Sequence, residues 1–250
     1  MIELIAIFLQ FCIFFIIFSF PFNPKNLNKL VNTKIHSFNY IDCHAINIII
    51  FINILLITSF LKIHLNHVFI ALFLTSIFFL IKRKNEYLSI INQKNLIKFF
   101  SFFIIIIAMF IDAAFEPRLE WDGHHWIQKA LVFFNNEPIQ NLTSVGMPEY
   151  PHLGGYIWAF FWKNSLLQYE YFGRFFYIYF YITSIFTVFN IANFKSEKLI
   201  YLVVFSLIII TYDKFLFGGY QEYLIFSTLL IASRFITVVN FNKNIEYNKI

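Results

Sequence analysis

Long apolar stretches alternate with short polar ones along the whole chain. A membrane-spanning helix needs about 20 apolar residues, or somewhat fewer where tilt or local thinning compensates. By this measure the predicted spans are 2–20, 45–61, 66–82, 97–114, 173–192, 198–212 and 217–238. The pattern predicts an all-α fold, a polytopic membrane helical bundle of about seven transmembrane helices.

One long loop, 115–172, separates the fourth predicted span from the fifth. It is too aromatic to be disordered, so we expect it to fold on the membrane surface. The chain thus divides into 1–114, the loop 115–172, and 173–250 with a short tail. Inside the loop, 123–134 has the spacing of an interfacial helix, and Pro151 to Trp162 is an apolar stretch too short to span. The expected apolar face of the first helix consists of Ile127, Leu131 and Phe134, and the other side of Asp122, His125, Trp126 and Lys129.

Composition supports the membrane class. Apolar residues make up 59% of the chain and charged residues 13%, which is more apolar surface than a soluble globule could bury. The net charge of +5 sits in particular loops, so nucleic acid is not an expected partner. Cys12 and Cys43 have no metal-type spacing. The first apolar segment lacks a basic leader and a cleavage site, and we expect it to be retained.

The distribution of Lys and Arg predicts the orientation. Alternating spans put thirteen of the nineteen basic residues on one side and ten of the fourteen acids on the other. Because cytoplasmic loops carry the basic excess, the N-terminus is expected outside and the C-terminus in the cytoplasm. The loop 115–172 is then extracytoplasmic, and a bacterial inner membrane is the expected location.

Three carboxylates on the predicted outer side are candidates for chemistry. Asp122 fits a general base, or simply an N-cap of the interfacial helix. Glu149 lies between two prolines, where an exposed loop carboxylate is the plainer interpretation. Glu222 falls about a turn inside the last predicted span, where a carboxylate is costly and a functional role is the default hypothesis.

Two cations lie near the same predicted surface. Lys129 and Arg174 could hold a lipid phosphate, or could simply extend from helix ends toward water. A divalent cation is a further candidate cofactor, and its ligands would be Asp122, His125 and Glu222.

Three short motifs share this side of the membrane. They are Trp121-Asp122 followed by Trp126 and Lys129-Ala130, then Pro148-Glu149-Tyr150-Pro151, then Gly219-Tyr220-Gln221-Glu222. In order and spacing they resemble bacterial GT-C glycosyltransferases of the protein-mannosyltransferase-like kind, over residues 117 to 226. Because such enzymes are commonly longer, the resemblance implies a truncated form or one half of a split enzyme.

The resemblance implies transfer of a sugar from a polyprenyl-phosphate carrier to a glycan, lipid or protein acceptor outside the membrane. Asp122 would match the general base and Glu222 the second acid. A cation at Lys129 or Arg174 would neutralise the departing phosphate. The remaining expected substrate contacts are Glu149, Tyr150, Trp126 and Tyr220.

Two other functions fit the pattern. A transporter or flippase for lipid-linked sugars would need charged or broken helices deep in the spans, and the first four predicted spans carry no charge near their middle. A non-catalytic membrane subunit of a polysaccharide system fits the short chain. Membrane lipids are expected neighbours in every case.

Overall fold

The described part of this computed structural model comprises residues 2–32, 37–85, 104–109, 119, 121–189, 202, 206 and 221–247. These residues form helices and turns and contain no β-strand, which confirms the all-α fold. The elements are α1 (Ile2–Ile17), α2 (Pro24–Val31), α3 (Tyr40–Phe60), α4 (Leu65–Lys82), α7 (Trp121–Phe134), the 3₁₀ helix η1 (Ile139–Ser144), α8 (Leu153–Lys163), α9 (Tyr171–Phe189) and α11 (Glu222–Tyr247).

Three of these helices are long and apolar enough to cross a membrane: α3, α4, and α11 over Glu222–Asn240. They fall on the predicted spans 45–61, 66–82 and 217–238, and α1 is a shorter apolar helix. The chain is therefore a membrane protein. Two thirds of the predicted span 97–114 and nearly all of 198–212 lie outside the described residues, so the count of seven stays a prediction.

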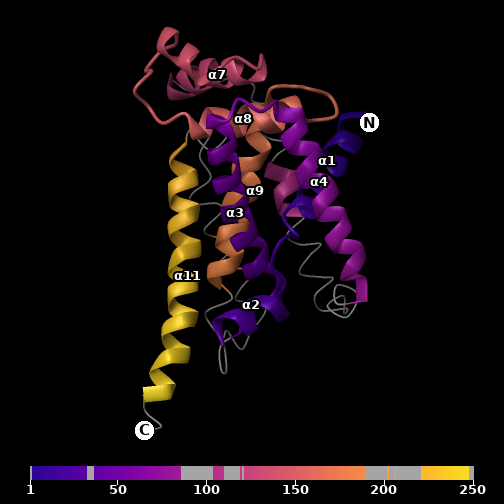
Figure 1. Cartoon of the computed structure of the whole chain (residues 1–250), viewed down its shortest axis with the longest axis vertical. Helices are drawn as coiled ribbons and strands as arrows, with labels where there is room; N and C mark the ends of the chain where they lie inside the picture. Colours follow the sequence, from indigo (N-terminus) through magenta and orange to yellow (C-terminus); the bar gives the residue numbers. More distant parts are fainter. Residues whose placement is uncertain are drawn as a thin grey trace.

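The long helices run side by side, and α7 lies across one end of them with α8 beneath it (Figure 1). The helix α2 lies toward the opposite end. We call these the α8 end and the α2 end. The helices α1, α4, α9 and α11 start near the α8 end and α3 starts near the α2 end. These are the directions that the predicted alternation requires, while the sidedness in the membrane stays a prediction.

The centre of the bundle is α9, which packs against α3, α8 and α11. Every residue from Phe172 to Thr187 is buried, and a helix that is covered on all faces belongs to the core. Aromatic rings fill the surrounding space; Phe14 of α1, for example, stacks on Phe175 at 4.9 Å between ring centroids. Gly173 lets α9 pack closely against α8, since a Cβ there would lie only 2.6 Å from the backbone oxygen of Trp158.

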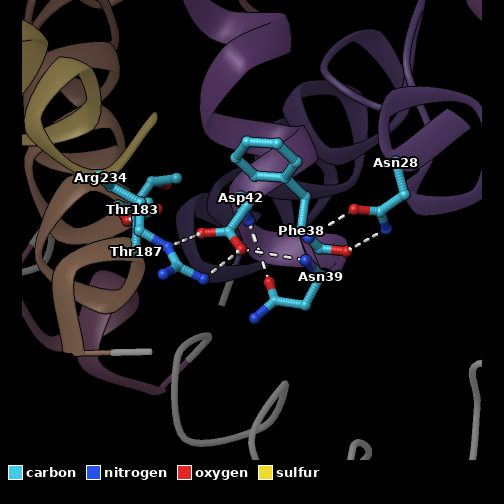
Figure 2. Close-up of polar contacts among 7 residues, drawn as sticks. All are labelled: Asn28, Phe38, Asn39, Asp42, Thr183, Thr187 and Arg234. Carbon is cyan, nitrogen blue, oxygen red and sulfur yellow. Dashed lines mark hydrogen bonds and ion pairs between the residues drawn. The ribbon is translucent and has the colours of Figure 1, made fainter. Parts of the chain in front are cut away.

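A buried ion pair joins α3 and α11 toward the α2 end (Figure 2). Arg234 Nε and Nη2 each donate to one oxygen of Asp42, both at 3.1 Å. Asp42 also accepts from the backbone N–H of Asn39 at 3.0 Å, and the Asn39 side chain caps the start of α3 in return. The sequence pattern assigns Arg234 to the tail side, whereas the structure buries it within α11, where Asp42 balances its charge.

Candidate functional site

The helix α7 confirms the predicted helix at 123–134 but shows a different face buried. Trp126 and Lys129 are buried, at 8% and 0% exposure, whereas Leu131 is 40% exposed. The reason is the contact with α8: at Gly155 a Cβ would lie 2.8 Å from Lys129 Cβ, so only glycine lets α7 approach on this side. The apolar stem of Lys129 therefore packs like a hydrophobic side chain.

The Lys129 ammonium ties α7 to the turn that precedes α8. Its Nζ donates to the backbone oxygen of Tyr150 at 2.7 Å and lies 5.3 Å and 5.7 Å from the ring centroids of Trp126 and Tyr150. Burial lowers the pKa of Lys129, and the Glu149 carboxylate acts in the opposite direction. Three residues of the predicted motifs, Lys129, Trp126 and Tyr150, are thus in direct contact, with Glu149 beside them.

His152, which follows this turn, connects α8 to the end of α3. Its Nε2 lies 2.8 Å from Ser59 Oγ. Ser59 gives its own hydroxyl proton to the backbone oxygen of Leu56 at 2.6 Å, so His152 is the donor to Ser59. Burial, and then the nearby Lys129 ammonium, lower the pKa of His152. The imidazole is therefore a neutral donor at neutral pH.

Two adjacent glycines let three other helices meet at the start of α8. Gly155 faces Lys129 of α7, and a Cβ at Gly154 would lie 3.0 Å from Gln221 Cγ, immediately before α11. The Tyr177 hydroxyl of α9 donates to the backbone oxygen of Gly154 at 2.8 Å. The start of α8 is therefore the point where α7, α9 and α11 converge.

The two candidate acids lie on the first turns of their helices. Asp122 is the second residue of α7, two helical turns and about 10 Å along the axis before Lys129. Its side chain lies outside the described residues. Glu222 is the first residue of α11 and is exposed, not a turn inside the span as the sequence suggests. Glu222 is therefore the first residue of the candidate span Glu222–Asn240, and no described part of the protein covers its side chain.

The Arg174 guanidinium forms an ion pair with Glu170, four residues earlier in the chain. Its Nε and Nη2 donate to the two carboxylate oxygens of Glu170 at 3.1 Å and 3.0 Å, and its side chain is fully buried. Burial raises the pKa of Glu170, and the Arg174 guanidinium opposes that rise. Arg174 serves the packing of α9, and its predicted contact with a phosphate finds no support in this geometry.

No three His, Cys, Asp or Glu side chains converge on a possible metal site within the described residues. A cation held by Asp122, His125 and Glu222 stays a prediction, because the Asp122 side chain is not among those described. Tyr220 also lies outside the described residues. The predicted stacking of Tyr220 on substrate is therefore neither confirmed nor contradicted.

The sequence patterns give no hint of one part of this region, where Thr58, Ser59 and Tyr156 meet. The Tyr156 hydroxyl donates to Thr58 Oγ1 at 3.3 Å, across 98 positions of sequence. Hydroxyl residues at a helix end are common, and nothing in their spacing predicts a partner so far along the chain. A signal was present in the glycine pair 154–155, which marks a close helix approach.

Comparison with known proteins adds no family to this description. No family model, curated protein or solved structure matches the chain. The resemblance to GT-C glycosyltransferases therefore stays a prediction from the motifs.

Proposed function

We propose that the chain is a membrane glycosyltransferase that acts at the α8 end, moving a sugar from a polyprenyl phosphate to an acceptor outside the membrane. One observation carries the proposal. The adjacent glycines of α8 receive Lys129 of α7 on one side and Gln221, next to Glu222, on the other. The first motif and the third, nearly a hundred residues apart in the chain, therefore meet at one short helix, beside the turn that holds the second motif.

In the proposed reaction Asp122 is the general base. Its carboxylate takes the proton from an acceptor hydroxyl while that oxygen forms a bond to the anomeric carbon of the donor sugar. The bond from the anomeric carbon to the phosphate oxygen breaks, and the polyprenyl phosphate leaves with the electron pair. Since phosphate is a good leaving group, one positioned base is enough, and such a base contributes about 10²–10⁴-fold to the rate.

Lys129 has a positioning role in this proposal. Its ammonium holds the backbone of Tyr150 and attracts Glu149, so it fixes the turn 148–151 against α7. An ammonium has three N–H donors, and Tyr150 is its one hydrogen-bond acceptor within the part of the chain that the structure describes. The ammonium is buried and lies about 10 Å along the helix axis from Asp122, so its charge acts on the reaction at a distance and does not contact the phosphate.

A non-catalytic membrane subunit is the second candidate function. Lys129 and Arg174, the two cations expected at a phosphate, are both fully buried and both bonded inside the chain. A subunit whose α8 end only docks a partner would need no accessible cation. The two candidates differ in whether a carboxylate at the start of α7 is required for sugar transfer.

The test is the Asp122→Asn variant, assayed for transfer of radiolabelled sugar from polyprenyl phosphates in membranes that contain the full chain. We expect a loss of about 10²–10⁴-fold in rate, as for removal of a positioned base. Glu3→Gln is the matched control, because Glu3 is an exposed carboxylate on the first turn of α1. Transfer by Asp122→Asn at the wild-type rate would exclude the proposed mechanism.

A further inference from the structure

A pocket of ≈ 230 Å³ with both polar and apolar walls lies beside the α8 end, apart from the contacts of Lys129. It is bounded by the turn between α3 and α4, by the stretch from the end of α7 to η1, and by Tyr156 of α8. Pockets that enclose drug-sized ligands have volumes of about 300–1,000 Å³. This pocket is smaller and fits a ligand of the size of one sugar ring.

The hydroxyl groups on the α3 side of the pocket can accept hydrogen bonds but have little left to donate. Thr58 and Ser59 each give their proton to a backbone oxygen one helical turn earlier. Tyr156 gives its proton to Thr58. A hydroxyl has one proton and two lone pairs, so lone pairs remain here for a ligand that donates.

Other residues of the pocket wall carry donors and a carboxylate. Lys62 and Asn136 both line it, and neither side chain has a hydrogen-bond partner among the residues described. Both residues have left-handed backbones, with φ of 53° and 59°, which turn the chain sharply around the pocket. Glu137 contributes a carboxylate that accepts from Asn141 at 2.8 Å and has further lone pairs.

Aromatic rings complete the wall. Phe133 and Tyr156 meet edge to face, with centroids 5.0 Å apart and planes at 81°. A small apolar surface beside groups that accept and groups that donate suits a ring that has C–H faces and several hydroxyls. A phosphate suits it less, because it has fewer hydroxyl protons than a sugar to donate to the Thr58 and Ser59 oxygens, and Glu137 opposes the attraction of Lys62.

We propose that this pocket binds one sugar ring and that, given the proposed function, it holds a sugar of a glycan acceptor other than the ring that reacts. Phe133, which lines the pocket, follows Lys129 by one turn of α7 and Asp122 by about three turns, roughly 16 Å along the axis. A ring bound here would therefore hold a longer acceptor beside α7 while another ring of the same glycan reaches Asp122. Binding of a sugar rests on the pocket alone, whereas its use as an acceptor rests on the proposed function.

The test uses the full chain in lipid nanodiscs and saturation-transfer NMR with methyl glycosides of glucose, galactose, mannose and N-acetylglucosamine as probes. We expect at least one of these glycosides to bind. Ser59→Ala and Asn136→Gly should each weaken that binding about five-fold, as expected for loss of one hydrogen bond. Asn136→Gly keeps the left-handed backbone while removing the amide, so it should fold normally.

Ser233→Ala is the matched control, since Ser233 also donates to the carbonyl oxygen three residues earlier, at 2.7 Å, but lies exposed on α11. Its affinity should equal that of the wild type. The proposal is overturned if no glycoside binds, if Ser59→Ala and Asn136→Gly bind as the wild type does, or if inorganic phosphate displaces the glycoside. Failure of the proposed function is separate, because Asp122→Asn would then transfer normally whatever the binding result.

Discussion

Polar groups at the two ends of the bundle differ in how many of their hydrogen-bond donors and acceptors have partners. Toward the α2 end, Asp42 and Arg234 are buried and bonded to each other through two parallel hydrogen bonds (Figure 2). At the α8 end, Thr58 and Ser59 keep lone pairs, and Lys62 has no hydrogen-bond partner in the described part of the chain. The comparison separates two uses of polarity in a membrane protein. Mutually satisfied groups hold helices together, and incompletely satisfied groups near the surface can bind a ligand.

The largest expected effect comes from breaking the ion pair. Arg234→Met leaves the Asp42 carboxylate buried without its partner, and loss of one member of a buried pair costs about 3–5 kcal/mol. We expect the free energy of unfolding to fall by about that amount. The measurement is unfolding of the purified protein in mixed micelles, followed by circular dichroism.

The double variant Asp42→Asn and Arg234→Met is the control for this prediction. Its asparagine can still accept from the backbone of Asn39, and no charge remains buried. We expect it to lie within about 1 kcal/mol of the wild type, because replacing a buried pair as a unit is often nearly neutral. Equal losses in the single and double variants would show that the cost does not come from a buried carboxylate left without its partner.

An intermediate effect is expected at the contact between α7 and α8. Gly155→Ala places a methyl group 2.8 Å from Lys129 Cβ and 3.2 Å from the backbone nitrogen of Ala130. We expect a loss of about 1–3 kcal/mol from overpacking, despite the better helix propensity of alanine. Gly146→Ala should cost less, because its methyl group meets only the side chains of His125 and Gln128. An unchanged melting temperature for Gly155→Ala would contradict this account of the contact.

The smallest expected effect is a pH dependence at His152. Its pKa in the folded protein is below the ordinary histidine value of 6.5, so below pH 6.5 the unfolded chain binds a proton more readily than the folded protein does. The free energy of unfolding should therefore decrease as the pH falls below 6.5. We expect melting curves at pH 7.5 and pH 5.5 to differ less in His152→Gln than in the wild type. His124→Gln, at an exposed histidine, should retain the full difference.

The apolar pattern predicts the fold well where helices face lipid. The spans predicted at 45–61 and 66–82 match α3 and α4 closely, because lipid requires a continuous apolar surface. The buried face of α7 is predicted only in part: Ile127 and Phe134 pack against the core as expected, but spacing alone cannot show that Gly155 admits the stem of Lys129. A glycine that permits close approach acts through its neighbour in space, and the sequence does not reveal that neighbour.

The candidate site also has a part that the sequence predicts and a part that it does not. The motifs correctly group Trp126, Lys129 and Tyr150, because the first two lie on one face of a helix and the third follows in the same loop. The contact of His152 with Ser59 spans 93 positions and depends on how α3 and α8 pack. Sequence spacing carries no information about such a pair. The last helix starts at Glu222, five residues later than the predicted span 217–238, and the apolar pattern alone does not show where within that stretch the helix begins.

Because α9 is covered by protein on every side, its side chains need not be as apolar as those of α3, α4 and α11. It carries Arg174 and four tyrosines, which lower its tendency to partition into a bilayer alone. Its entry into the membrane therefore depends on helices made earlier. During synthesis α3 and α8 leave the ribosome before α9 and α11 leaves after it, so α9 first meets two of its partners and is covered on its remaining side only when α11 arrives.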